Sequence, residues 1–327
     1  MKRLFQKLFF LVGLLTTHAL MAQEVTEAAK HARPKPLTFF DFLLQPKFIV
    51  MLLIGAAVLL LLKTKKMKKS IKTGLLLLST FLFGFAGNIP ADFFHSFAMH
   101  PSPMCAASKP LLFGFHIPFI VTLAVIFFLT LVGPKLFCGY ICPLGAVQEL
   151  ISMLAAKLKI TRKKFSFVPA HTVRLLIFLL FIFISVTAVL YETYEGQVFP
   201  KSLYDYINPF HGLEFSANAS LIGYLIHYLP FILVVILAFK YYRPYCHFVC
   251  PIGIFAHVLE QVALFKISLK RKSCTDCGVC EKKSPCTAVP EILKESLLRP
   301  DCYACNECIE VCPEKALEVG VKRTTLK

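Results

Sequence analysis

The sequence predicts an α-helical membrane bundle with an internal two-span repeat, followed by a small cysteine-rich α+β domain. Three observations support this fold class. The chain has 327 residues, is 57% apolar and has a mean hydropathy of +0.66, which is too apolar for a soluble protein of this length. Eight of its 13 cysteines lie between residues 274 and 312. A stretch built around two cysteines occurs twice, at residues 134–150 and 242–258.

Residues 1–22 have the pattern of a signal peptide or an N-terminal anchor. Lys2, Arg3 and Lys7 precede a short apolar run, and small residues stand near Ala22. Either outcome places residue 23 onward outside the cell membrane. Residues 23–72 are therefore expected to form a periplasmic linker and the first span.

Five further apolar segments are expected to cross the bilayer. The first has only 15 residues, which is short of the roughly 17–25 that a spanning helix needs. Lysine side chains at its two ends are expected to lengthen it by reaching the membrane surface. The five segments are residues 48–62, 73–89, 117–133, 173–190 and 221–239.

Basic residues fix the expected orientation of these spans. The connections after the first, third and fifth spans are rich in Lys and Arg, whereas residues 90–116 and 191–220 are poor in both. The positive-inside rule then places residues 90–116 and 191–220 in the periplasm. The chain is predicted to lie in a bacterial inner membrane with its C-terminus in the cytoplasm. Because the basic residues cluster beside apolar runs, the net charge of +17 does not indicate a nucleic-acid partner.

The cysteines near the C-terminus are spaced as iron–sulfur ligands. The second run, followed by Pro313, has the C-x2-C-x2-C-x3-C-P spacing of bacterial ferredoxins. Three thiolates from one loop bind three irons of a cubane, so the fourth ligand must come from elsewhere; in two-cluster ferredoxins it comes from the other run. The two runs are Cys274, Cys277, Cys280 and Cys286, and Cys302, Cys305, Cys308 and Cys312.

This spacing predicts two [4Fe–4S] clusters in a ferredoxin-like domain at residues 266–327. One cluster is assigned to Cys274, Cys277, Cys280 and Cys312, and the other to Cys302, Cys305, Cys308 and Cys286. The first run departs from the pattern because five residues precede Cys286 and Thr287 replaces the proline. Zinc is the competing ligand, but two C-x2-C-x2-C runs are poor zinc spacing. Structural disulfides are disfavoured by a cytoplasmic location.

Residues 73–265 are expected to form the repeated transmembrane core. Each repeat carries C-x3-C-P-x-G, with Cys138 and Cys142 in the first copy and Cys246 and Cys250 in the second. Proline is favoured at the first position of a helix, so Cys142 and Cys250 are predicted at helix N-caps. There the helix dipole is expected to lower the thiol pKa. The four thiols are candidate ligands of a third cluster or metal, or a redox-active set.

With these motifs in place, residues 70–315 resemble the NapH/NosR-type membrane polyferredoxins. The resemblance is carried by FCGYICPLG, YCHFVCPIG and the two cysteine runs. It implies that the eight C-terminal cysteines bind [4Fe–4S] clusters and that the chain transfers electrons in an inner membrane. This family includes the quinol dehydrogenase membrane subunit linked to periplasmic nitrate reductase.

Other polar residues in apolar surroundings are candidate sites. The segment after the second span holds soft and borderline ligands that suit copper or an axial haem position. Tyr224 and His227 could offer hydrogen bonds to a quinone head group. Arg174 is expected to reach the membrane surface with its long side chain, and His211 is expected to be structural. The soft-ligand set is His95, Met99, His100, Met104 and Cys105.

The favoured function is therefore membrane-bound iron–sulfur electron transfer between a membrane donor, such as quinol, and an unidentified redox partner. This would make the chain a subunit of an oxidoreductase, such as a quinol dehydrogenase component, without catalytic side chains of its own. Two alternatives remain. One is a copper-related maturation factor for a respiratory oxidase, which the His/Met segment would fit. The other is a redox sensor.

Overall fold

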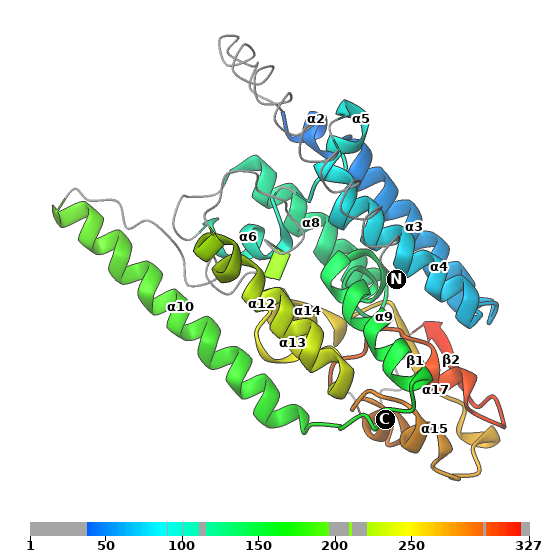
Figure 1. The fold of residues 1–327 in the computed structure, drawn as a ribbon. Helices are drawn as coiled ribbons and strands as arrows, with labels where there is room; N and C mark the ends of the chain where they lie inside the picture. The colour runs from blue at the N-terminus through cyan, green and yellow to red at the C-terminus, as the bar shows by residue number, and fades with distance from the viewer. Residues whose placement is uncertain are drawn as a thin grey trace, which may run out of the picture.

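The computed structural model describes residues 38–89, 91–99, 101–110, 116–195, 209–210, 221–296 and 299–321. The predicted signal segment and His211 lie outside these residues. Helices dominate, and one small sheet stands near the C-terminus (Figure 1). The longer helices are α3 (Pro46–Lys63), α4 (Lys69–Thr80), α8 (Ile117–Val132), α9 (Pro143–Lys157), α10 (Phe167–Glu195), α12 (Leu221–Lys240) and α14 (Pro251–Glu260).

Short helices and irregular turns connect these elements. Two are π-helices, at Phe81–Phe85 and Phe137–Ile141, and two are 3₁₀ turns, at Ala86–Asn88 and Arg271–Ser273. The short α-helices are α2 (Phe39–Leu43), α5 (Asp92–His95), α6 (Pro103–Ser108), α13 (Pro244–Phe248), α15 (Val279–Lys283), α16 (Val289–Leu293) and α17 (Glu307–Glu310).

All five predicted apolar segments are helical. The first is longer than the apolar run suggests, because α3 begins at Pro46 and continues for 18 residues to Lys63. Among the described helices, α3 and the first 18 residues of α10 are long and apolar enough to cross a bilayer. The helix α8 and part of α12 are apolar but shorter.

Large apolar side chains are exposed on the outer faces of three helices. Leu53 in α3 is 63% exposed, Phe183 in α10 is 67% exposed and Leu229 in α12 is 63% exposed. A water-soluble protein rarely exposes so much contiguous apolar surface. These faces therefore suit contact with lipid.

The segment that carries the C-terminal cysteines begins and ends at two neighbouring strands of one small sheet. Strand β1 (Phe265–Leu269) follows α14, and strand β2 (Leu317–Val321) pairs with it in antiparallel register, Ile267 opposite Val319. Residues 270–316 leave from one strand and return to the other. All eight cysteines of the two C-terminal runs lie in this segment, at the end of the molecule away from α2 and α5 (Figure 1).

Candidate functional site

The two C-x3-C-P segments, residues 138–143 and 246–251, are called the cysteine turns here. Their second cysteines share one backbone geometry, although the first cysteine lies in a π-helix in one copy and in α13 in the other. Cys142 caps α9 with φ −58° and ψ 119°, and Cys250 caps α14 with φ −62° and ψ 119°. In both helices the proline that follows occupies the first turn, where its missing N–H is not needed. The prediction that both cysteines are N-cap residues is confirmed.

A basic residue in the left-handed conformation stands three positions before each turn. Lys135 has φ 45° and Arg243 has φ 49°, and the two residues are equivalent in the repeat. Both side chains are buried. This conformation is uncommon for residues with a side chain, so its recurrence at equivalent positions supports a structural repeat.

Two buried arginines hold the backbone of the turns. Arg243 donates from Nη1 to the Cys138 carbonyl oxygen at 2.6 Å and from Nη2 to the Gly139 carbonyl oxygen at 2.9 Å. Arg174 donates from Nη1 to the Cys246 carbonyl oxygen at 2.9 Å. Each turn therefore has a guanidinium on the carbonyl of its first cysteine. The expectation that Arg174 reaches the membrane surface is wrong, since its side chain is fully buried.

The glycine of each C-P-x-G motif leaves room for these contacts. A Cβ on Gly145 would overlap the Cys138 carbonyl oxygen and lie 3.1 Å from Arg243 Nη1. A Cβ on Gly253 would lie 2.5 Å from Arg174 Nη1 and 2.9 Å from the Cys246 carbonyl oxygen. Glycine is thus required by the close packing of turn and guanidinium.

We expect Gly145→Ala and Gly253→Ala each to lower the free energy of unfolding by about 1–3 kcal/mol, the usual effect of overpacking. Gly74→Ala is the matched control, because nothing lies within 4 Å of a Cβ at that helical position. The control should be neutral or stabilising by about 0.5–1 kcal/mol. Thermal unfolding in detergent, followed by circular dichroism, measures the difference. Equal melting temperatures for all three variants would contradict the tight-turn interpretation.

The fold brings the four turn cysteines together. The thiols of Cys142, Cys246 and Cys250 lie close enough to Cys138 to act electrostatically on it. Cys138 and Cys246 are buried, while Cys142 and Cys250 are partly buried. The predicted candidate site therefore has its four thiols in one region, two from each half of the repeat.

The expectation that the helix dipole lowers the thiol pKa is wrong. Burial raises the pKa of Cys250 to about 12, and it raises the pKa of Cys142 as well. Backbone N–H groups of Gly253 and Ile252 act in the opposite direction at Cys250 but are outweighed. A bound metal would reverse this balance, because a coordinating thiol is deprotonated by the charge of the ion.

Four cysteines of the C-terminal region line one pocket. Cys274, Cys277 and Cys280 from the first run face Cys312 from the second, together with Gly278 and other residues of the same loops. This is the set that the sequence assigns to one cluster. The contribution of Cys312 matters because it comes from the opposite run.

The remaining four cysteines lie deeper. Cys302, Cys305, Cys308 and Cys286 are all buried, and the neighbouring Cys286 thiol, together with burial, raises the pKa of Cys305. The long link before Cys286 is explained locally: its first three residues continue α15, and Ser284 Oγ then lies 3.4 Å from Cys286 Sγ. The inserted residues thus bring Cys286 back toward the second run.

The spacing of these groups bears on which metal centre they fit. Among the described residues, no three His, Cys, Asp or Glu side chains are grouped so as to hold a single metal ion. Each thiolate of a cubane binds a different iron, so cubane ligands lie farther apart than the ligands of one ion. All-thiol donor sets with C-x2-C-x2-C spacing, as in the two C-terminal runs, suit a cubane.

A buried carboxylate, Asp301, stands directly before Cys302 and joins both turns to the C-terminal region. It forms an ion pair with Lys135, and its Oδ2 lies 2.9 Å from Arg174 Nη1. His257 Nδ1 lies 3.1 Å from its Oδ1. Burial alone would raise the pKa of Asp301, but the charges of Lys135 and Arg174 hold it well below its usual range.

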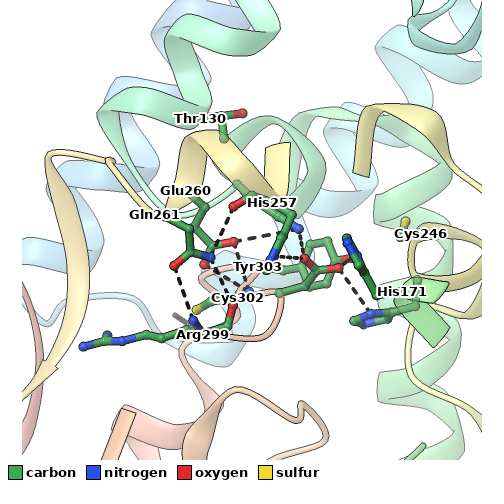
Figure 2. A network of polar contacts seen from close by, with 12 residues as sticks. Thr130, His171, Cys246, His257, Glu260, Gln261, Arg299, Cys302 and Tyr303 are labelled. Atoms are coloured by element: carbon green, nitrogen blue, oxygen red, sulfur yellow. Dashed lines mark hydrogen bonds and ion pairs between the residues drawn. The ribbon is translucent and has the colours of Figure 1, made fainter. Parts of the chain in front are cut away.

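Figure 2 shows His257, Tyr303 and Cys302 side by side in this network. The Tyr303 hydroxyl donates to Asp301 Oδ2 at 3.4 Å, and its ring centroid lies 4.7 Å from Cζ of Arg243. Tyr303 is therefore in contact with the arginine that holds the first turn, and it also belongs to the second cysteine run. It lies between two of the three cysteine groups.

A second buried carboxylate, Glu149, links the helices around the first turn. Its Oε1 lies 2.6 Å from Lys72 Nζ and its Oε2 lies 2.9 Å from Arg243 Nε. Burial opposes ionisation, but these two cations outweigh burial and lower the pKa of Glu149 to about 2. Lys72 Nζ also lies 3.7 Å from Glu307 Oε1 in α17, beside the second cysteine run. Helices α4 and α9 and the C-terminal region thus share one charge network.

The predicted soft-metal set does not come together in the described residues. Met99 packs in the large apolar core, whereas Met104 packs in a separate cluster with Leu144 and Phe181. Met104 Sδ instead accepts a hydrogen bond from the Tyr245 hydroxyl, next to the second turn. His100 lies outside the described residues.

Two further candidates remain untested by the structure. Tyr224 and His227 belong to α12, but their side chains lie outside the part of the chain that the structure describes. Sequence reasoning missed the residues that position the cysteine groups, which are Lys135, Glu149, Arg243, Asp301 and Tyr303. The left-handed pair Lys135 and Arg243 could have been found from their equivalent places in the repeat.

Comparison with known proteins agrees with this site. A family profile described as "4Fe-4S binding domain" matches residues 115–164 and 225–272, and each match contains one cysteine turn. Uncharacterized protein MJ0750 of Methanocaldococcus jannaschii is 30% identical over 198 residues, covering 61% of this chain and 77% of that protein. No solved structure matches.

Two relatives carry informative names. The ferredoxin-type protein NapH of Haemophilus influenzae is 29% identical over 228 residues, covering 63% of this chain and 71% of that protein. The putative electron transport protein YccM of Escherichia coli is 28% identical over 205 residues, covering 61% of this chain but only 54% of that protein. These similarities and the assembled cysteines define an iron–sulfur electron-transfer protein of the ferredoxin type. The chain belongs to the NapH/NosR-type family of ferredoxin-type membrane proteins.

Proposed function

We propose that this protein carries electrons through three [4Fe–4S] clusters at an inner membrane. The first would be held by Cys274, Cys277, Cys280 and Cys312, and the second by Cys286, Cys302, Cys305 and Cys308. The third would be held by the turn cysteines Cys138, Cys142, Cys246 and Cys250. A bound cluster supplies one-electron exchange, with a potential tuned by hydrogen bonds and burial.

One observation carries the proposal. The four turn cysteines meet from the two halves of the repeat, and both matches to the "4Fe-4S binding domain" profile fall on those halves. The matches end at residue 272, before the first C-terminal cysteine. The description therefore supports a cluster at the turns, while the ferredoxin spacing independently supports two more clusters.

The order of the groups suggests a path through the protein. The pocket of the first cysteine group opens at the surface, the second group is buried, and Tyr303 lies between the second group and the turns. Electrons would pass from the first group to the second and then to the turn site, or in the reverse direction. The protein's own residues provide the fixed spacing, and the Asp301 network between the second group and the turns is buried.

A multi-pass arrangement is part of the proposal. The five apolar helices would cross the membrane, with the C-terminal domain in the cytoplasm because the basic connections lie on that side. The exposed leucines of α3 and α12 support contact with lipid. The membrane donor would be quinol or another carrier in the bilayer, and the partner that completes the chain is a redox protein.

The test is the iron content of protein purified anaerobically in detergent. We expect about 12 irons and 12 sulfides per chain, because three cubanes contain four of each. Cys142→Ser combined with Cys250→Ser should retain about eight, and EPR of the reduced variant should lack one signal. Cys105→Ser, outside every group, is the matched control and should retain all 12. Eight irons in the unmodified protein would refute the third cluster, and stoichiometric zinc would refute the proposal as a whole.

A further inference from the structure

The three cysteine groups differ in their exposure to solvent. Cys277 is exposed, and Cys274 and Cys312 are half-buried, so the first group opens at the surface. All four cysteines of the second group are buried. A soluble carrier can exchange electrons only with a centre that it approaches closely. The first group is therefore the one positioned to meet a partner from solution.

The position of this opening favours access from the aqueous phase. The opening lies beside α15, which packs against α16 and α17. Figure 1 shows α15 at the same end of the molecule as the lower ends of α10 and α12. The pocket therefore lies at the end of the molecule where these apolar helices end.

The rim is basic. Within residues 270–283 and 312–316, six Lys and Arg residues stand against three acidic residues. Arg271 pairs with Asp276 at 2.8 Å. Lys272, Lys282 and Lys283 are exposed and make no ion pair with any residue that the structure describes. We call these three residues the rim lysines.

We propose that the rim lysines form a docking face for a small, soluble, acidic one-electron carrier. The inference rests on the proposed function, because it needs a cluster in the first cysteine group. Complementary charge accelerates encounter and fixes the orientation of the partner. One electron passes between the reduced carrier and the oxidised cluster, or in reverse; no bond is formed or broken and no proton is required.

Anionic lipid is the competing ligand for a basic surface. The location of the rim lysines favours a protein, because each lies within three residues of a cysteine that lines the opening of a redox site. The lysines that follow α3 directly, such as Lys66 and Lys68, are the ones placed beside a span for head groups. The experiment keeps the two ligands separate.

The test uses cluster-loaded full-length protein in nanodiscs of neutral phosphatidylcholine. Stopped-flow absorbance measures the second-order rate of electron exchange with a small acidic ferredoxin and, in parallel, with the basic carrier cytochrome c. The variant Lys272→Gln, Lys282→Gln, Lys283→Gln is compared with Lys66→Gln, Lys68→Gln, Lys69→Gln, which removes the same charge from exposed lysines elsewhere. Iron content and the reduction potential of each cluster are measured on every sample.

We expect the rim variant to react with the acidic carrier at least about tenfold more slowly at low salt, and to lose most of the salt dependence. The control variant should stay within about twofold, and the reaction with cytochrome c should not slow. Equal rates for both variants would overturn the proposal. So would a slower rate explained by a changed cluster potential. Absence of iron in the first cysteine group would instead refute the proposed function.

Discussion

Replacing Asp301 by alanine is expected to lower the free energy of unfolding by about 3–5 kcal/mol. The side chain is fully buried, and it compensates the charges of Lys135 and Arg174, which are fully buried as well. Removing the carboxylate leaves buried Arg174 without its carboxylate partner and Lys135 with only the more distant Glu260 at 3.8 Å, and a poorly compensated charge in an apolar interior is costly. Because Asp301 precedes Cys302, we also expect loss of iron from the second cysteine group.

A surface ion pair provides the control. Glu318 lies 2.6 Å from Lys270 but is 28% exposed, so Glu318→Gln should cost about 0–1 kcal/mol. Chemical denaturation in detergent under anaerobic conditions measures both variants. Adding Arg174→Met to Asp301→Ala should recover part of the loss, since it removes one of the two stranded charges. An Asp301→Ala protein as stable as Glu318→Gln would show that the buried network contributes little.

Replacing Gly139 by alanine should separate the first cysteine turn from the second cysteine run. A Cβ at Gly139 would lie 2.5 Å from the Tyr303 carbonyl oxygen, which is backbone and cannot rotate away. We expect a loss of about 1–3 kcal/mol and a displacement of residues 301–304 from the core. The hydrogen bond from the Tyr140 hydroxyl to the Ala304 carbonyl, 2.9 Å long, should be lost with it.

Hydrogen–deuterium exchange detects this displacement directly. The amide of Cys302, which donates to Glu260 Oε1 at 3.1 Å, should exchange faster in Gly139→Ala, while the β1–β2 amides should be unchanged. Under the proposed function, electron passage between the C-terminal cysteine groups and the turn site should slow in the same variant. Gly74→Ala again serves as the control. Unchanged protection at Cys302 would mean that the close approach of Gly139 to Tyr303 is not needed for docking.

The helices and the motif positions could be predicted from sequence because they depend on local pattern. Apolar runs gave the five helices, and the C-P pairs gave the N-caps of α9 and α14. The ferredoxin spacing predicted Cys312 opposite Cys274, Cys277 and Cys280, and these four line one pocket. Periodicity and spacing carry this information because the contacts lie within a few residues of each motif or recur at a fixed offset.

The residues that position the cysteines could not be predicted because their partners are distant. Asp301 and Arg174 are 127 positions apart, and Glu149 and Arg243 are 94 apart. Arg174 was expected at the membrane surface because a charge near a helix end usually reaches water. Its actual burial depends on a carboxylate that no local pattern identifies. The thiol pKa was mispredicted for the same reason, since burial is a property of the whole fold.

The pairing of β1 with β2 has a consequence for swapping chain segments between related proteins. Because residues 270–316 begin and end at neighbouring positions, this part of the chain could be replaced by the corresponding part of a relative without altering the path of the membrane helices. Such a chimera would still have to match the surface that receives it. A donor segment without an acid at the position of Asp301 would bring foreign clusters to Lys135 and Arg174 with no counter-charge. Compatibility of chimeras should therefore be governed by that one position more than by overall identity.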